Sequence, residues 1–202
     1  MPAASTAQNP SREDLADSVA QLDQVLATFN ALLRIARVES GAYRSAFTTV
    51  DLKPIVHDVC ELYQAAAEEC QVTLQAKAAD PVEVFGDREL LAQVLTNLVD
   101  NAVRHTNEGS VTVFSKRTPG GIAIGVSDTG IGIPADHLAR IFERFYRVDA
   151  GRSRSEGGTG LGLAIVKHLV EGHGGRVRAE STVGRGTRIW AELPDPPPVT
   201  TA

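Results

Sequence analysis

A carboxylate stands directly before a glycine-rich turn in the middle of the chain. Residues 128–134 read DTGIGIP, and alternating apolar residues from Ile122 to Val126 lead into them as in a strand. The two glycines leave the backbone bare and allow a close approach. A carboxylate can accept a hydrogen bond from the 6-amino group of adenine, whereas guanine carries an oxygen there. Asp128 is therefore a candidate for base recognition, although the stretch alone is more typical of a tight surface turn.

A second polar group lies on a helix that the sequence predicts from Asp87, its N-cap, to about His105. Within the segment NLVDNAVRHT, Asn97, Asn101 and Arg104 recur at intervals of three or four residues and so share one helix face. Amide oxygens can hold a hard cation and leave room for water and phosphate, as Mg²⁺ prefers. Asparagines that only cap or cross-link helices are an equally good interpretation of this segment alone.

A third segment, IFERFYRVD at residues 141–149, combines aromatic and basic side chains. Phe142 and Phe145 are predicted to pin an otherwise irregular segment to the core. Arg147 offers a planar guanidinium that matches the geometry of a phosphate.

The fourth segment, GGTGLGLAI at residues 157–165, opens a predicted helix. Bare backbone N–H groups at a helix N-terminus form an anion site, assisted by the helix dipole. The segment is not a Walker A loop, because no Gly-Lys-Ser/Thr follows. A glycine-rich loop alone is a weak signal, but four such segments in this order and spacing are a strong one.

The first 45 residues predict a different kind of element from the rest. Apolar residues follow alternating spacings of four and three, which is a heptad seam, and they predict a helix over residues 11–40, about 45 Å long. Its length and wide apolar face are typical of a multi-helix bundle rather than of a helix packed on its own domain. The seam comprises Leu15, Val19, Leu22, Leu26, Phe29, Leu33 and Ala36.

The remaining segments alternate between helix and strand patterns, which predicts a two-layer α/β sandwich behind the long helix. A helix from Asp51 to about Glu69 carries an apolar stripe of Ile55, Val56, Val59, Leu62 and Tyr63. A further helix is predicted over residues 161–173, a short extended piece over residues 47–50, and strands over residues 72–76, 82–85, 110–116, 121–127, 176–181 and 187–193. Residues 1–10 and 194–202 are expected to be disordered.

Composition excludes several classes of protein. The net charge of −5 over 202 residues argues against a nucleic-acid binder, which would carry a basic face. The two cysteines, Cys60 and Cys70, form no zinc-binding pattern. No apolar run is long enough to span a bilayer, and no signal peptide opens the chain.

Taken together, the four segments resemble the N, G1, F and G2 boxes of the sensor histidine kinases, within the ATPase fold shared with Hsp90, type II topoisomerases and MutL. The resemblance covers about residues 45–193, and GRGT at 184–187 resembles a further glycine–threonine element of that fold. The phenylalanine segment and RVESG at 37–41 favour the kinase branch. The resemblance implies an α+β, Bergerat-type ATP-binding fold with a mixed sheet packed on three helices.

The resemblance also implies ATP as the nucleotide and Mg²⁺ as the metal. Asn101 would ligate Mg²⁺, and Asn101 and Arg147 would be the catalytic residues. Asp128 would bind the adenine amino group with support from Thr187, and residues 133–160 would form a mobile lid. The implied ATP-binding residues are Asn97, Asn101, Arg104, His105, Asp128, Gly130, Gly132, Arg147, Gly158, Thr159, Gly160, Leu161, Gly162 and Thr187.

One element of the family is missing from this sequence. The family transfers the γ-phosphoryl group to a histidine in an H box resembling SHELRTPL, and none of the five histidines here precedes a Leu-Arg-Thr-Pro run. Residues 11–41 resemble the second helix of the dimerisation hairpin, without the acceptor. The chain alone is therefore expected to bind Mg²⁺ and ATP but not to phosphorylate itself.

The partners implied are an acceptor-histidine helix, a response regulator, and a second copy in the full-length context. The resemblance further implies a cytoplasmic location, or the cytoplasmic portion of a membrane-anchored sensor. Two alternatives are a nucleotide-regulated binding module that docks a helical partner, and an anti-sigma-type serine kinase. The heptad helix and the RVESG run argue against the second alternative.

Overall fold

The computed structural model describes residue 29 and residues 46–78, 81–148 and 159–195. The predicted N-terminal helix lies outside the described residues, except for Phe29, which is helical and 57% exposed. The segments predicted as disordered, residues 1–10 and most of 194–202, also lie outside them. Within the part of the chain that is described, no helix has the length and apolar character needed to cross a membrane.

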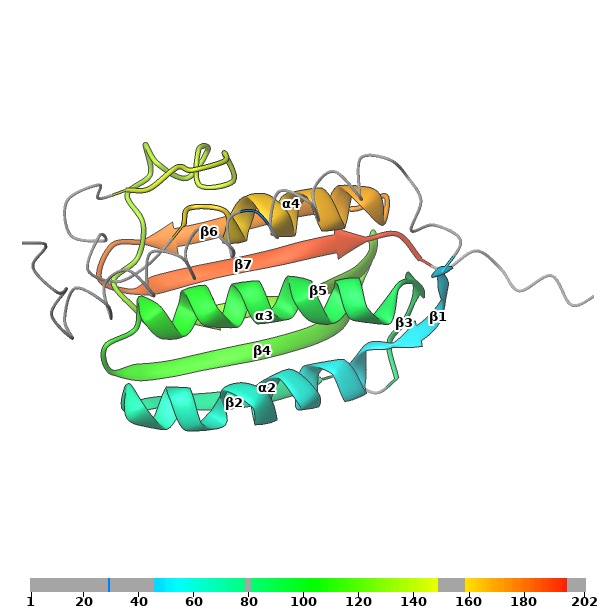
Figure 1. Ribbon diagram of the computed structural model, residues 1–202, viewed down its shortest axis with the longest axis horizontal. Coiled ribbons are helices and arrows are strands. Elements are labelled where there is room, and N and C mark those ends of the chain that lie inside the picture. Colours follow the sequence, from blue (N-terminus) through cyan, green and yellow to red (C-terminus); the bar gives the residue numbers. More distant parts are fainter. Residues whose placement is uncertain (1–28, 30–45, 79–80, 149–158, 196–202) are drawn as a thin grey trace, which may run out of the picture.

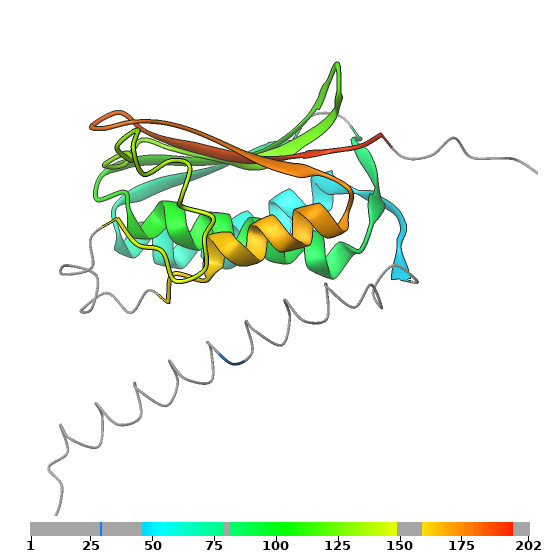
Figure 2. The same ribbon diagram turned by 90° about the horizontal axis from the view of Figure 1, so that it is seen from above.

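The described residues form two layers, a five-stranded mixed sheet and three helices that cover one of its faces (Figures 1 and 2). The helices are α2 (Leu52–Glu69), α3 (Arg88–Arg104) and α4 (Gly162–Gly172). The strand order is β2 (Val72–Ala78), β4 (Gly109–Thr118), β5 (Gly121–Asp128), β7 (Gly186–Leu193) and β6 (Arg176–Thr182). Only β2 and β4 pair in parallel. The predicted α+β fold, with a mixed sheet on three helices, is confirmed.

Two short strands form a separate antiparallel sheet beside the main one. They are β1 (Thr48–Asp51) and β3 (Glu83–Gly86), with Val50 opposite Val84. The strands predicted over residues 72–76 and 82–85 are both confirmed, but they lie in different sheets because β2 pairs with β4 and β3 pairs with β1. The Leu52 amide donates to Val82 O at 3.0 Å, which joins the start of α2 to the small sheet.

Two of the helices begin at the aspartates where the sequence predicts a helix start, and Asp87 was predicted as an N-cap. Asp51 Oδ1 accepts from the Lys53 amide at 2.9 Å at the start of α2. Asp87 Oδ1 accepts from the amides of Glu89 and Leu90 at 2.8 and 3.1 Å at the start of α3. Each carboxylate thus satisfies N–H groups that the first helical turn leaves without a partner.

The predicted apolar stripe of α2 is wrong at one position. Leu62 is 69% exposed, whereas the buried line of the helix runs through Val59, the partly buried Tyr63 and Ala67. Successive residues of an α-helix are rotated by about 100°. Leu62 therefore points away from a line that follows a spacing of four residues.

His173 joins three elements at the end of the molecule that holds the small sheet. It is 6% exposed, its Nδ1 donates to Leu169 O at 2.7 Å, and its Nε2 accepts from the Asp87 amide at 3.2 Å. The imidazole also stacks on Phe47, with ring centroids 4.6 Å apart. These contacts connect the end of α4 to the cap of α3, and they require the neutral ring because Nε2 is an acceptor.

The pKa of His173 makes this junction sensitive to acid. Burial lowers the pKa, and the hydrogen bond to Leu169 and the nearby Asp87 carboxylate oppose the shift. Since the folded-state pKa lies below the unfolded value of about 6.5, the unfolded chain binds more protons. The stabilisation of the fold by the neutral His173 ring is complete above about pH 6.5, and it is lost as the pH falls towards the folded-state pKa.

We expect His173→Gln to remove the part of the pH dependence of the free energy of unfolding that comes from this histidine. At about pH 7.5 the substitution should cost ~1–3 kcal/mol, because it breaks a buried hydrogen bond and a ring contact. Urea unfolding at about pH 7.5 and about pH 5.5 measures both effects. His57→Gln, at an exposed position of α2, is the control and should retain the wild-type pH dependence. An equal pH dependence in the two variants would contradict the assignment.

Candidate functional site

The Asp128 carboxylate links two strands at one end of the sheet. Its Oδ1 accepts from the backbone amides of Gly130 at 2.9 Å and Thr187 at 3.0 Å. The first bond closes the turn after β5, and the second holds the start of β7. Oδ2 has no hydrogen-bond partner among the described residues, and so it remains available to a ligand.

Burial sets the electrostatics of this carboxylate. It raises the pKa of Asp128 above its usual value, while the bonds from Gly130 and Thr187 and the nearby His105 act in the opposite direction. A hydrogen bond made by a group shielded from water is stronger than one made in bulk solvent. The position therefore suits an acceptor for an amino group of a bound base.

The glycines of the turn are required by the protein's own backbone. A Cβ at Gly130 would lie 2.1 Å from His105 O, and Gly132, with a φ of +72°, would place one 2.2 Å from Thr182 O. The turn is held by backbone bonds from the Ile131 amide to His105 O at 3.1 Å and from the Gly184 amide to Ile131 O at 2.8 Å. The close approach predicted at these glycines thus joins the end of α3 to the β6–β7 turn.

Ser181 supports this turn from β6, and the sequence reasoning did not single it out. Its Oγ accepts from the Ile133 amide at 2.7 Å, donates to Gly186 O at 3.0 Å and lies 2.9 Å from Thr187 Oγ1. Ser181 is opposite Thr187 in the register. The available signal was a polar residue at an inward position of a strand whose other inward residues are Val177 and Ala179.

The asparagine face of α3 lies against the start of α4. Asn97 Nδ2 donates to Gln93 O at 2.8 Å, and a Cβ at Gly162 would be 3.4 Å from Asn97 Oδ1. No described residue hydrogen-bonds to the Asn101 side chain. Arg104 is half exposed and pairs with Asp100 at 2.9 Å, and His105 is the exposed C-cap. The structure therefore brings Asn97 to the glycine-rich segment and leaves the Asn101 amide for a ligand.

The N-terminus of α4 has no side-chain cap. Thr159 Oγ1 accepts from the Leu161 amide at 3.2 Å, and Leu161 itself is fully buried. Gly160 has a φ of +68°, and its carbonyl accepts from the Phe145 amide at 2.9 Å. First-turn amides without a cap are suited to an anion. Gly158 lies outside the described residues.

Arg147 carries an unpartnered donor. Its Nη2 is buried and has no hydrogen-bond acceptor among the described residues. A buried donor left unpaired costs about 1–3 kcal/mol. Such a group fits an anionic ligand that would supply the acceptor.

The predicted anchoring of the aromatic segment is half right. Phe142 packs against the core, but Phe145 is 57% exposed. Phe145 has a positive φ of 64°, held by its bond to Gly160, and it is Tyr146 that packs inwards in its place. The Tyr146 hydroxyl contacts His137 Nδ1, and the Arg140 guanidinium lies 4.3 Å from the Tyr146 ring centroid.

These segments meet at one end of the molecule, where the turn after β5, the β6–β7 turn and the start of α4 lie together (Figure 1). The groups present are an acceptor in Asp128 Oδ2, uncapped amides of α4 and an unpaired donor in Arg147. This donor set fits a nucleotide with an amino-bearing base and phosphates. No group of three or more His, Cys, Asp or Glu that could hold a metal occurs among the described residues.

Comparison with known proteins identifies the class. The family described as "Histidine kinase-, DNA gyrase B-, and HSP90-like ATPase" matches residues 86–197, which is more than half of the 202 residues. The chain belongs to this ATPase family.

Within the family, the chain is similar to sensor kinases. It is 37% identical over 180 residues to the sensor-like histidine kinase SenX3 of Mycolicibacterium smegmatis, covering 89% of this chain and 47% of that protein. It is 32% identical over 192 residues to the signal transduction histidine-protein kinase BaeS of Escherichia coli, covering 93% and 41%. The chain thus spans less than half the length of these relatives.

The chain is also similar to a solved structure. Full-length ShkA in complex with AMPPNP has a TM-score of 0.77 and 31% sequence identity, covering 93% of this chain and 40% of that one. The resemblance to the catalytic part of the histidine kinases is confirmed.

We expect Gly130→Ala to disrupt the turn. Its Cβ would collide with His105 O, so the turn must move and the stability should fall by ~1–3 kcal/mol, with weaker nucleotide binding. Thermal unfolding and calorimetric titration with ATP measure the two effects. Gly120→Ala is the matched control, because a Cβ there meets nothing within 4 Å. If the two variants melt at the same temperature, the packing role of Gly130 is wrong.

Proposed function

We propose that this chain is the ATP-binding catalytic part of a sensor histidine kinase. It would transfer the γ-phosphoryl group of ATP to a histidine on a partner helix, for onward transfer to a response-regulator aspartate. The observation that carries the proposal is the Asp128 carboxylate, with Oδ1 held by two backbone amides and Oδ2 open to a base. The similarity to sensor histidine kinases supports it.

The site residues would divide the work between base and phosphates. Asp128 would accept from the adenine amino group, and Thr187 would hold that carboxylate in place through its amide. Gly130 and Gly132 would keep the turn closed. The α4 amides, with residues 158–162, and Arg104 would lie towards the phosphates, and His105 beside the base.

Asn101, Asn97 and Arg147 would meet the charge that develops during transfer. Phosphoryl transfer needs positioning and charge neutralisation more than covalent chemistry from the protein. Mg²⁺, when bound through Asn101 and the phosphates, would neutralise phosphate charge. Arg147 would donate its unpaired Nη2 to a phosphate oxygen, which removes the cost of a buried orphan donor.

The wider context is also part of the proposal. Residues 11–41 would form the second helix of a dimerisation hairpin, and residues 45–193 the catalytic domain, in a parent protein that dimerises. The acceptor histidine would come from another segment or chain, because the sequence contains no H box.

We expect Asp128→Asn to change the choice of base. The amide oxygen can still accept from the Gly130 and Thr187 amides, but its NH₂ group then faces the adenine amino donor. ATP affinity should fall by about tenfold, equivalent to ~1.4 kcal/mol, and the preference for ATP over GTP should shrink. Calorimetric titration with both nucleotides measures this.

Asp58→Asn on the α2 surface is the control for Asp128→Asn, since it removes the same charge away from the site. Its affinities should equal those of the wild type. Unchanged ATP affinity and an unchanged ATP/GTP ratio in the Asp128 variant would refute the base-reading role.

We expect phosphoryl transfer only when an acceptor is added. Incubated with labelled ATP and Mg²⁺, the chain alone should stay unlabelled, whereas a helical hairpin that bears an H box should gain acid-labile label. Asn101→Ala should slow this transfer by at least about tenfold, with the defect depending on Mg²⁺. Acid-stable label on the isolated chain would favour a serine kinase, and ATP-dependent docking of the hairpin without transfer would favour a binding module.

A further inference from the structure

The face of the main sheet that the described helices leave uncovered carries a row of aromatic and basic residues. The row crosses all five strands in register, through Lys77, Phe114, Gly125, Trp190 and Arg178. The alternate residues of these strands, such as Val113 and Ile189, belong to the core on the helix side. Phe114 is only 8% exposed yet lies outside that core cluster, so it is covered from the other face.

Arg188 covers this aromatic row. Its guanidinium carbon lies 4.6 Å from the Phe114 ring centroid and 5.3 Å from that of Trp190. Gly125 lies between the two aromatic residues, and a Cβ there would be 2.6 Å from Trp190 Cα, so the glycine allows β7 to lie this close to β5. The two rings therefore hold the guanidinium in one orientation by cation–π contact.

The guanidinium of Arg188 has hydrogen-bond donors that no described residue accepts from. Its Nε is buried without an acceptor, and no ion pair or side-chain hydrogen bond joins it to a described residue. The two Nη atoms are not among the buried unpaired atoms, so they are open to solvent. A guanidinium fixed by stacking is a preorganised fork for a carboxylate.

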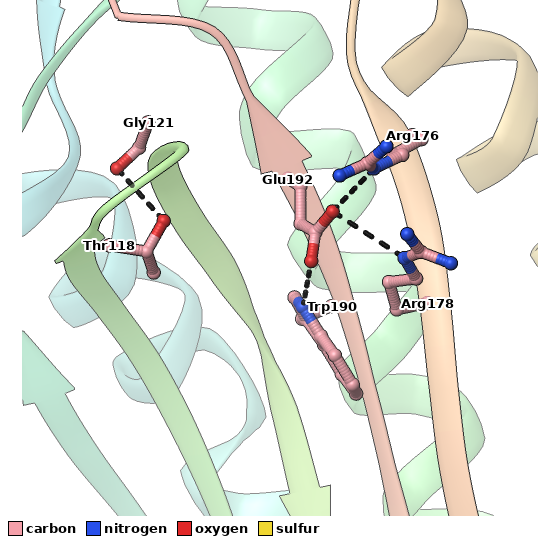
Figure 3. Close-up of polar contacts among 6 residues, drawn as sticks. All are labelled: Thr118, Gly121, Arg176, Arg178, Trp190 and Glu192. Carbon is pink, nitrogen blue, oxygen red and sulfur yellow. Dashed lines mark hydrogen bonds and ion pairs between the residues drawn. The ribbon is translucent and has the colours of Figure 1, made fainter.

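The charge around Arg188 has the opposite sign to that of the whole chain. Cationic side chains at Lys77, Lys116, Arg176, Arg178 and Arg188 outnumber the carboxylates of Glu180 and Glu192 on this face, although the net charge of the chain is −5. Glu192 is already occupied, accepting from Arg176 at 2.5 Å, from Trp190 at 3.4 Å and from Arg178 at 3.5 Å (Figure 3). This face therefore attracts anions to an otherwise acidic molecule.

We propose that this face docks an acidic segment of a partner protein on a basic–aromatic patch formed by Lys77, Phe114, Arg178, Arg188 and Trp190. A carboxylate of the segment pairs with Arg188, the positive charges of Lys77 and Arg178 attract the segment at longer range, and the exposed part of Trp190 supplies apolar contact. The row spans four gaps between strands, about 19 Å, which matches about six residues of extended peptide.

The burial of the aromatic rings favours a protein segment over an anionic membrane surface. Interfacial binding to lipid relies on apolar side chains that insert into the headgroup region. Here Phe114 is covered by Arg188 and Trp190 is only partly exposed, so no large apolar side chain protrudes from the patch. Paired carboxylates at the surface need no such insertion.

Trp190 gives a direct readout, because it is the only tryptophan of the chain. We expect an eight-residue glutamate peptide to change its fluorescence saturably, and an eight-residue lysine peptide to leave it unchanged. Because the contacts are at the surface, binding should weaken as the ionic strength rises. Fluorescence anisotropy of a dye-labelled glutamate peptide measures the affinity independently of Trp190.

A pair of charge-matched variants separates the patch from general electrostatics. Arg188→Gln should weaken peptide binding by about tenfold, through loss of the fixed fork. Arg88→Gln, which removes the same charge from an arginine paired with Asp58 on α2, should change it by less than about twofold. Both variants should keep the wild-type affinity for ATP, which separates this surface from the nucleotide site.

Three results would overturn the proposal. An equal loss of peptide affinity in the Arg188 and Arg88 variants would mean that binding depends only on the net charge of the protein. Arg188-dependent binding to vesicles containing phosphatidylglycerol, without binding of the glutamate peptide, would make the partner a lipid surface. Absence of peptide binding to the wild type at low salt would also refute it.

Discussion

One carboxylate oxygen holds the functional end of this protein together. Asp128 Oδ1 accepts from the Gly130 and Thr187 amides and so joins the end of β5, the turn after it and the start of β7. These amides are far apart in the sequence but adjacent in space, since β5 and β7 are neighbours in the sheet. The bonds help to offset the burial of the carboxylate and leave its second oxygen for a ligand.

The two faces of the sheet serve different purposes. The face under the helices builds the core and ends in Asp128, with the asparagines of α3 against the start of α4. The uncovered face carries Arg188 between Phe114 and Trp190. Since strand residues alternate between faces, Thr187 and Arg188 are adjacent in β7 and yet belong to opposite sides.

Local sequence patterns predicted the elements well and their contacts less well. The helix starts at Asp51 and Asp87 and the strands that form β4 and β5 follow from short-range signals, and all are confirmed. Leu62 and Phe145 were predicted to be buried, and both are exposed. In each case an apolar residue fits the pattern, but a neighbouring aromatic residue, Tyr63 or Tyr146, takes the inward position.

The sequence by itself determined the helices, the strands and the resemblance of four segments to the kinase boxes, because periodicity, caps and glycine spacing act over a few residues. Only the tertiary structure decided that Gly130 is required by His105 O, that Ser181 supports the turn, and that Arg188 lies between two aromatic rings. Each of these contacts joins residues from different elements. Such contacts depend on strand order and register, which the local pattern of a single sequence does not specify.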